Sequence, residues 1–172
     1  MTLGTRIVVM SAGIVQQVDT PQVLYDTPCN LFVAGFIGSP QMNFLDATCK
    51  VNGNKVALEV GGAAIELPPA KAKKLIEGGY DGKTVVLGIR PEDVHDEPMF
   101  IASSPNTVIE SKIRVYEMLG AEVYLYFDYA GASMTARVDP RTTARTGDTV
   151  KFAFDAEKIH VFDKETECTI TN

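Results

Sequence analysis

The chain has 172 residues, enough for one domain, or one domain plus an appendage, whose core needs neither metal nor disulfides. Acidic residues outnumber lysine and arginine by 22 to 16, and the basic residues are scattered, so no nucleic-acid partner is predicted. The three cysteines include no Cys-x-x-Cys pair, which predicts reduced thiols and no metal site. Because the longest apolar run, residues 31–37, is far too short to span a bilayer, we expect a cytoplasmic protein.

Residues 1–40 differ in pattern from the rest of the chain. Two apolar stretches, residues 6–10 and 14–18, flank small residues and predict a β-hairpin. Two short helices follow, one beginning at Thr20-Pro21 and one capped by Asn30. These elements offer no self-sufficient core, so we interpret them as the end of a larger domain. With apolar strand edges cut from that domain, we expect residues 1–40 to pack across a partner chain or to be poorly ordered.

From residue 41 onward the pattern is typical of a mostly β domain. Asn52-Gly53 predicts a hairpin turn, and residues 71–76 predict a short helix with Leu75 and Ile76 facing inward. Roughly nine short strands at intervals of about eight to twelve residues favour a small barrel or sandwich over residues 41–172. Between two of these strands, residues 91–106 contain three prolines and predict a long loop that is either functional or mobile.

The stretch 85–94 is a strand that ends abruptly in charged residues. Pro91 removes a backbone donor and disfavours helix at Arg90, so Arg90, Glu92 and Asp93 are expected at the rim of a sheet. Gly88 leaves room for close approach. This arrangement is typical of a contact site. It is also what any strand that ends in charged residues looks like, and the residue types alone favour that second interpretation.

No catalytic site is predicted from the residues. Residues 78–84 end like a phosphate-binding loop, but Glu77 stands where that motif needs its first glycine, and the order is helix, turn, strand. His95 and His160 have no second histidine or cysteine at metal-ligand spacing. We therefore predict no catalytic, cofactor-binding or metal-binding residue in this chain.

Several short motifs together resemble the ATP-binding subunits of carbohydrate and glycerol-3-phosphate ABC importers, similar to the maltose-importer ATPase subunit. They are Arg6-Ile7-Val8-Val9-Met10, Gly13, Gln16-Gln17, Thr20-Pro21, Tyr25-Asp26, Pro28, Asn30, residues 32–40, Met42-Asn43-Phe44, residues 88–93, residues 117–120 with 122–126, Gly147-Asp148 and residues 160–163. The resemblance implies a remnant of the α/β ATPase domain in residues 1–40 and an OB-type regulatory domain in residues 41–172.

The Walker A loop, the signature motif, the Walker B acid and the switch histidine of that family do not occur here. The resemblance therefore implies a C-terminal fragment that is not an enzyme, while ATP and Mg²⁺ bind the full-length parent. It also implies a homodimer, membrane-spanning permease subunits that contact the parent's ATPase domain, and a parent on the cytoplasmic face of the inner membrane. Some family members receive inhibitory signals from a regulatory protein or a metabolite at this domain.

The function implied is a non-catalytic regulatory and dimerisation domain. The residues proposed for regulation or for the interface are Gly88, Arg90, Pro91, Glu92, Asp93, Glu117 and Gly120. We expect the charged ones near Arg90 to hold two halves of the domain, or two copies of it, in register. The alternative is a sensor of a small ligand, such as an oxyanion or a sugar phosphate.

Overall fold

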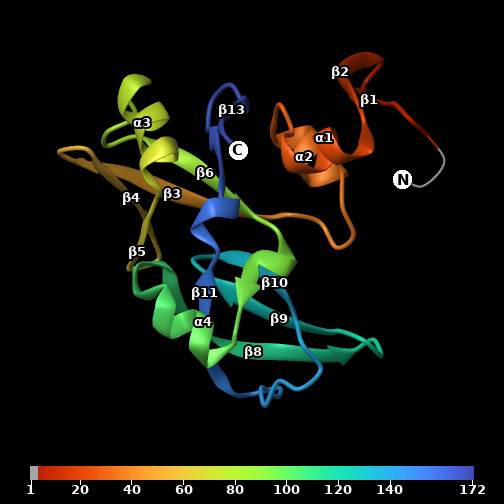
Figure 1. Cartoon of the computed structure of the whole chain (residues 1–172), viewed down its shortest axis with the longest axis vertical. Coiled ribbons are helices and arrows are strands. Elements are labelled where there is room, and N and C mark those ends of the chain that lie inside the picture. Colours follow the sequence, from red (N-terminus) through yellow and green to blue (C-terminus); the bar gives the residue numbers. More distant parts are fainter. Residues whose placement is uncertain (1–3) are drawn as a thin grey trace.

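The computed structural model describes residues 4–172, which form a hairpin and two larger antiparallel sheets (Figure 1). The hairpin pairs β1 with β2, the six-stranded sheet has the order β13-β12-β6-β3-β4-β5, and the five-stranded sheet has the order β10-β9-β8-β11-β7. The strands are β1 (Ile7–Ser11), β2 (Ile14–Asp19), β3 (Asn43–Asn52), β4 (Lys55–Val60), β5 (Ala63–Glu66), β6 (Thr84–Ile89), β7 (Val94–His95), β8 (Val108–Met118), β9 (Val123–Tyr129), β10 (Ala132–Val138), β11 (Thr149–Phe154), β12 (His160–Asp163) and β13 (Thr169–Thr171).

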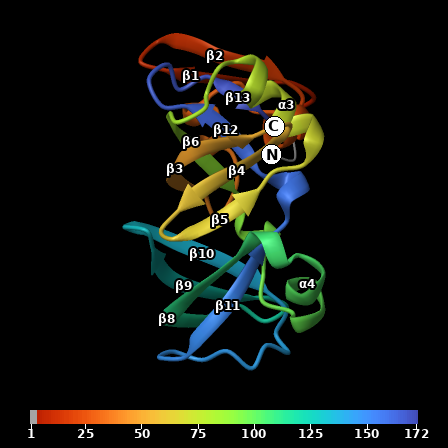
Figure 2. The same ribbon diagram turned by 90° about the vertical axis from the view of Figure 1, so that its left-hand side faces the viewer.

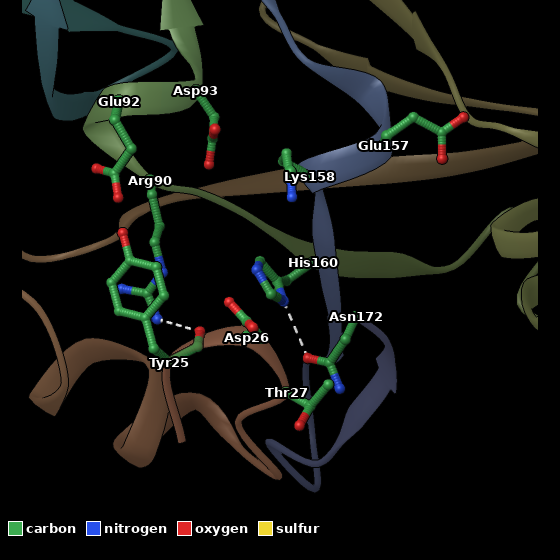
Figure 3. A pocket seen from close by; sticks show the side chains of 10 residues that line it. All are labelled: Tyr25, Asp26, Thr27, Arg90, Glu92, Asp93, Glu157, Lys158, His160 and Asn172. Atoms are coloured by element: carbon green, nitrogen blue, oxygen red, sulfur yellow. Dashed lines mark hydrogen bonds between the residues drawn. The ribbon is translucent and has the colours of Figure 1, made fainter. Parts of the chain in front are cut away.

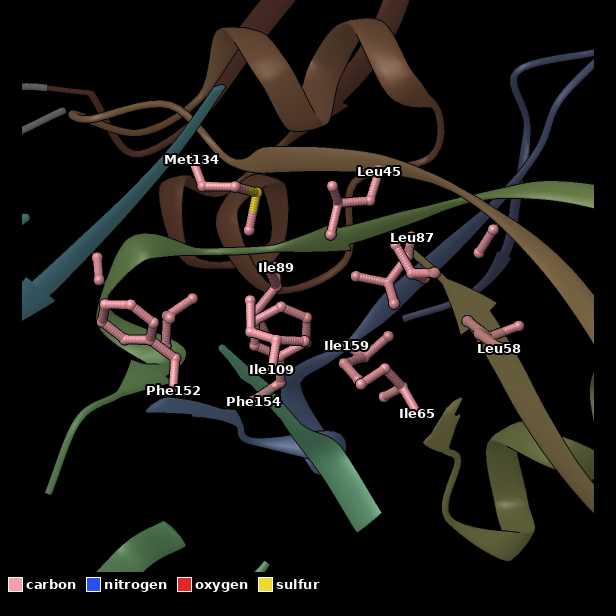
Figure 4. Packing of buried hydrophobic residues seen from close by; sticks show 14 of the residues in the cluster. Leu45, Leu58, Ile65, Leu87, Ile89, Ile109, Met134, Phe152, Phe154 and Ile159 are labelled. Atoms are coloured by element: carbon pink, nitrogen blue, oxygen red, sulfur yellow. The ribbon is translucent and has the colours of Figure 1, made fainter. Parts of the chain in front are cut away.

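The two larger sheets lie one above the other and share a single core (Figure 2). Alternate residues of each strand point inward, so Leu45 and Leu87 of the six-stranded sheet join Phe152 of the five-stranded sheet in one buried cluster (Figure 4). Phe127 stacks on Phe152 with ring centroids 4.4 Å apart. The mostly β, barrel-like fold predicted from strand spacing is confirmed, and we refer to residues 41–172 as the β domain.

The N-terminal segment, residues 4–40, is ordered by contacts within the same chain. Helix α1 (Pro21–Asp26) begins after Thr20, whose hydroxyl accepts from the Val23 N–H at 3.4 Å, and the Asn30 side chain caps α2 (Leu31–Phe36) in the same way. A small buried cluster lies beneath these helices, formed by Val9, Leu24, Val33 and Ile37.

This cluster corrects the expectation that residues 1–40 would be poorly ordered, whereas the packing of this segment across a partner chain stays a prediction. The described part of that range has its own small core and packs onto the β domain in cis. Residues 1–3 lie outside the described residues. One face of the hairpin nevertheless stays exposed, and it carries Val8, Met10, Ile14, Val15 and Val18.

The predicted loop at residues 91–106 is largely structured, which is a second correction. It contains the 3₁₀ turn η1 (Pro91–Asp93), strand β7, helix α4 (Pro98–Ser103) and the 3₁₀ turn η2 (Pro105–Thr107). Each of the three prolines that suggested a loop instead begins a helical turn. Its missing N–H is not needed there, and its fixed φ suits the first helical position.

Helix α3 (Pro69–Glu77) is followed by a turn and then by β6, so the glycines at 78–82 lie in a turn as predicted. Leu75 faces inward as predicted, but Ile76 is partly exposed, which corrects the prediction that both face inward.

The unexpected inward residue of α3 is Lys71. Its ammonium group donates to the main-chain oxygens of Ile159, at 2.9 Å, and Asn172. Burial lowers the pKa of Lys71, although the nearby Glu157 opposes this effect. The last short helical turn of the chain is η3 (Ala156–Lys158).

Candidate functional site

Arg90 leaves the end of β6 in an extended conformation, with φ −76° and ψ 150°, and Pro91 then begins η1. Gly88, two residues earlier, lies against the side chains that cover this end of the sheet. A Cβ at position 88 would lie 2.6 Å from Met42 Sδ and 2.9 Å from Phe162 Cε2. Glycine is therefore needed for packing, which keeps β6 close beneath these two side chains.

The Arg90 side chain joins the β domain to the N-terminal segment. It is only 2% exposed; Nη1 donates to the Ile37 carbonyl at 2.9 Å and Nη2 to the Tyr25 carbonyl at 2.6 Å. The guanidinium carbon lies 3.7 Å from the centroid of the Tyr25 ring. Because Tyr25 and Ile37 end α1 and α2, one cation satisfies carbonyls at the negative ends of two helices.

Gly38 makes room for this contact. Its φ is +119°, and a Cβ there would lie 2.8 Å from Arg90 Nη1. Any other residue would have to adopt a disfavoured backbone conformation and would also displace the guanidinium. The structure thus places Arg90 against the N-terminal segment, rather than against the other half of the β domain.

A cleft of about 350 Å³ opens beside Arg90, between the N-terminal segment and the β domain. We call it the junction cleft (Figure 3). Arg90 Nε is buried and has no hydrogen-bond partner among residues 4–172. Every other buried side-chain nitrogen or oxygen atom in the described part of the chain has one. The cleft is lined by Tyr25, Asp26, Thr27, Arg90, Glu92, Asp93, Glu157, Lys158, His160 and Asn172.

Burial shifts the pKa values of three groups in the junction cleft. It lowers the pKa of Arg90 to about 10 against the opposing effect of Asp93 and Asp26, so the guanidinium stays charged at neutral pH. Burial, followed by the nearby charges of Glu92 and Asp155, raises the pKa of Asp93 to about 6. Burial also lowers the pKa of His160 to about 4, although its hydrogen bond to Asn172 opposes the shift.

A second attachment joins the N-terminal segment to the last strand. Asn30 and Cys168 form an antiparallel bridge, flanked by hydrogen bonds from Leu31 N to Glu167 O and from Thr169 N to Cys29 O, both 3.0 Å. The Thr169 hydroxyl also donates to the Pro28 carbonyl at 2.6 Å. The segment is therefore attached at three places: the Arg90 contact, this bridge, and the packing of Ala34 in α2 on Met42, Val86 and Phe162 of the β domain.

Glu117 and Gly120 lie elsewhere, at the turn between β8 and β9, and do not line the junction cleft. Glu117 accepts a hydrogen bond from the Tyr126 hydroxyl at 2.8 Å, and Gly120 has φ +77° in the turn. The end of this hairpin projects from the molecule (Figure 1). It carries three exposed apolar side chains, namely Val115 (46%), Met118 (57%) and Leu119 (47%).

The structure brings five of the seven predicted residues together, those from Gly88 to Asp93, and separates them from Glu117 and Gly120. The sequence interpretation missed the partners of Arg90 because these lie far along the chain. Tyr25 and Ile37 precede it by dozens of residues, and His160 and Asn172, which line the cleft beside it, follow. A glycine just after the second expected helix was the one available signal at Gly38, but helix termination alone accounts for a glycine at that position.

Among the described residues, no group of three or more His, Cys, Asp or Glu side chains is placed to hold a metal ion. Within residues 4–172, no helix is long and apolar enough to cross a membrane.

Comparisons with known proteins identify the class. Residues 38–94 match the MalK OB fold domain, and residues 87–162 match the TOBE domain, so the two matches overlap at the stretch that contains Gly88 and Arg90. A solved structure of the cytoplasmic molybdate-binding protein ModG has a similar fold, with a TM-score of 0.52 and 15% identity over 69% of this chain and 94% of that one. The fold is thus an OB-type domain joined to a TOBE domain.

Curated relatives narrow the family. The oligosaccharides import ATP-binding protein MsmX of Bacillus subtilis is 45% identical over 170 residues, covering 99% of this chain and 46% of the relative. The multiple sugar-binding transport ATP-binding protein MsmK of Streptococcus mutans is 40% identical, covering 99% and 47%. The trehalose/maltose import ATP-binding protein MalK of Thermococcus litoralis is 40% identical, covering 96% and 44%.

The chain therefore contains a MalK-type OB fold domain and a TOBE domain, and it is similar to the ATP-binding subunits of sugar ABC importers. It spans about half the length of the curated relatives it matches.

Proposed function

We propose that the chain is the non-catalytic regulatory and dimerisation domain of an ATP-hydrolysing subunit that drives the import of sugars or related solutes. In this proposal the parent protein binds ATP and Mg²⁺ through a domain outside this sequence and contacts membrane-spanning permease subunits through that same domain. The parent would work at the cytoplasmic face of the inner membrane. A regulatory protein or a metabolite could then inhibit transport by acting on the β domain.

The observation that carries this proposal is the contact of Arg90 with both helices of the N-terminal segment. A regulatory domain must be mechanically joined to the domain that it regulates. The buried guanidinium makes that join with two charge-assisted hydrogen bonds and a stacked tyrosine ring, in a setting where water does not screen them. Movement at the ends of α1 and α2 is therefore transmitted to β6, in the middle of the six-stranded sheet.

We assign the contact between two copies of the chain to the end of the β8–β9 hairpin. Val115, Met118 and Leu119 expose apolar surface there, next to Glu117 and Gly120, the two predicted residues outside the junction cleft. Exposed apolar side chains that gather at one projecting point favour a protein contact. The turn is held rigid by a hydrogen bond from Leu119 N to Glu122 O at 2.9 Å, which lowers the entropic cost of binding.

Sedimentation velocity at tens of micromolar protein tests this assignment. We expect the unmodified chain to be a dimer, and the double variant Met118→Lys with Leu119→Lys to be a monomer with unchanged circular dichroism. The matched control is Met99→Lys in α4, because Met99 is 88% exposed but distant in sequence from the hairpin. A monomeric unmodified chain, or a dimer that survives the double variant, would refute the proposed contact.

A further inference from the structure

We propose that the junction cleft binds a small neutral polyol, such as a mono- or disaccharide, held between the N-terminal segment and the β domain. Arg90 Nε is the donor of this site, and His160 with the surrounding carboxylates supplies the acceptors. The inference deepens the proposed regulatory function by naming a ligand class for it. Its test measures binding, so its failure is distinguishable from failure of the dimer or of the regulatory role.

The donor is defined by the contacts of Arg90. Its two Nη atoms have main-chain acceptors, whereas Nε is buried and has no partner among the described residues. A buried N–H without an acceptor is costly, and such atoms are rare unless water or a ligand supplies one. Arg90 lines the junction cleft, and Asp26 and His160 lie across it (Figure 3). An oxygen atom bound there would complete the hydrogen bonds of the guanidinium.

The acceptors are defined by the protonation of His160. Its Nδ1 lies 2.9 Å from Asn172 Oδ1, an acceptor, so the neutral ring carries its hydrogen on Nδ1. Nε2 is then free to accept. Since the pKa of His160 is lowered to about 4, the ring stays neutral at physiological pH. A polyol can donate from one hydroxyl to Nε2 and accept from Arg90 Nε at another oxygen, which neither a pure donor nor a pure acceptor can do.

The charges in the cleft select against anions. Four carboxylates line it, from Asp26, Glu92, Asp93 and Glu157, against the two cations Arg90 and Lys158. An oxyanion or sugar phosphate would meet this excess of negative charge. Hydroxyl groups suit both the carboxylates and the cations, because they donate to carboxylates and accept from arginine and lysine. The volume of about 350 Å³ lies in the range of small-molecule sites.

The position of the cleft gives the ligand a regulatory consequence. Asp26 and Thr27 belong to the N-terminal segment, while Glu92 and His160 belong to the β domain. A ligand that contacts both parts binds best when they are docked, so it stabilises the docked arrangement by mass action. Occupancy of the cleft would thus report solute in the cytoplasm to the segment that leads into the ATPase domain.

The test is a titration of the ¹⁵N-labelled 172-residue chain followed by NMR, including the arginine Nε–H signals. The probes are D-glucose and maltose, with inorganic phosphate and spermidine as the charged comparisons. We expect a saturable shift of the Arg90 Nε–H signal and of residues 25–27 with at least one sugar, with affinity in the millimolar range, none with phosphate, and no tighter binding of spermidine than of the sugar. Saturation should also raise the melting temperature.

Variants distinguish this site from non-specific binding. Glu92→Gln and Glu157→Gln each remove one cleft carboxylate, and neither carboxylate accepts a hydrogen bond from a residue in the range 4–172, so each variant should weaken sugar binding at least threefold without disturbing another contact. The matched control is Glu110→Gln on β8, outside the cleft, which should leave binding unchanged. The NMR spectrum itself reports whether each variant is folded. No saturable shift with either sugar up to about 50 mM, tighter binding of phosphate or spermidine, or equal weakening by the control would overturn the proposal.

Discussion

The side-chain amide of Asn43 forms with the main chain of Thr135 the two hydrogen bonds that a neighbouring strand would otherwise form. Asn43 Nδ2 donates to the Thr135 carbonyl at 2.9 Å, and Asn43 Oδ1 accepts from the Thr135 N–H at 2.8 Å. Asn43 begins β3 in the six-stranded sheet, whereas Thr135 lies in β10, an edge strand of the five-stranded sheet. One amide group therefore joins the two sheets and closes the exposed edge of β10 at its middle.

Replacing Asn43 by alanine should destabilise the fold by about 1–3 kcal/mol, because it leaves two main-chain groups of a partly buried strand without partners. The measurement is urea unfolding followed by circular dichroism. Asn106→Ala is the matched control, since Asn106 is exposed and its amide donates only to Glu66, at 3.0 Å. The control should cost less than about 0.5 kcal/mol. If both variants lose equally little stability, the sheets do not depend on this amide.

Replacing Arg90 by lysine should release the N-terminal segment. Lysine keeps the charge but cannot reach two carbonyls in different directions while stacking on Tyr25. We expect a loss of about 2–4 kcal/mol in the free energy of unfolding. Hydrogen exchange followed by mass spectrometry should show faster exchange in residues 20–40, with the β sheets still protected.

Arg114→Lys is the control for this change. Arg114 also donates through both of its Nη atoms, from Nη1 to the Asp128 carboxylate and from Nη2 to the Ser133 hydroxyl, but its side chain is half exposed, so its loss should cost less than about 1 kcal/mol. Unchanged exchange in residues 20–40 of Arg90→Lys would count against the role of Arg90 in docking the segment.

His160 should make the fold less stable at acidic pH. The pKa of a histidine in the unfolded chain is near 6.5, but in the folded chain burial lowers it to about 4. Between these values the unfolded state binds more protons, so the stability due to neutral His160 is complete above pH 6.5 and is lost as the pH falls towards 4. The unfolding free energy of the unmodified chain, minus that of His160→Gln, should fall by about 1–3 kcal/mol between pH 7 and pH 4.

Asp93→Asn provides a comparison in which the change of stability with pH has the opposite sign. Burial raises the pKa of Asp93 to about 6 in the folded chain, from an ordinary value of 3.8, so the folded state binds more protons between these values. The buried charge therefore destabilises the chain at neutral pH, and this penalty disappears as the pH falls below 6. Asp93→Asn should be more stable than the unmodified chain at pH 7 and no more stable at pH 4. A parallel pH dependence for the two variants would contradict both assignments.

Local patterns in the sequence predicted most of the elements. The hairpin predicted at Asn52-Gly53 is present, although its turn is Gly53-Asn54, one residue later, because Asn52 still pairs with Lys55. This hairpin, the caps at Thr20 and Asn30, and the strand that ends before Arg90 all depend on residues that are neighbours along the chain. The prolines of residues 91–106 were misread because proline disfavours a preceding helical residue but also begins helical turns well. Which effect dominates depends on the tertiary contacts of each turn.

The candidate site was less predictable because its contacts join residues that lie far apart in the sequence. Arg90 was singled out as a charged residue at a rim, but its burial comes from Tyr25 and Gly38, which no local pattern pairs with it. Lys71 shows the same difficulty, since a lysine on a short surface helix gave no sign that its ammonium group would reach two main-chain oxygens near the chain end. In both cases a charged side chain is buried by satisfying carbonyls, which composition cannot reveal.

The attachments of the N-terminal segment have a mechanical consequence. A body held at a single point can swivel in any direction, and each further point of attachment removes freedom of rotation. The Arg90 contact, the bridge between Asn30 and Cys168, and the packing of Ala34 on Met42, Val86 and Phe162 are three such points. A displacement of α1 and α2 therefore reaches the six-stranded sheet with little freedom to be absorbed by swivelling of the segment.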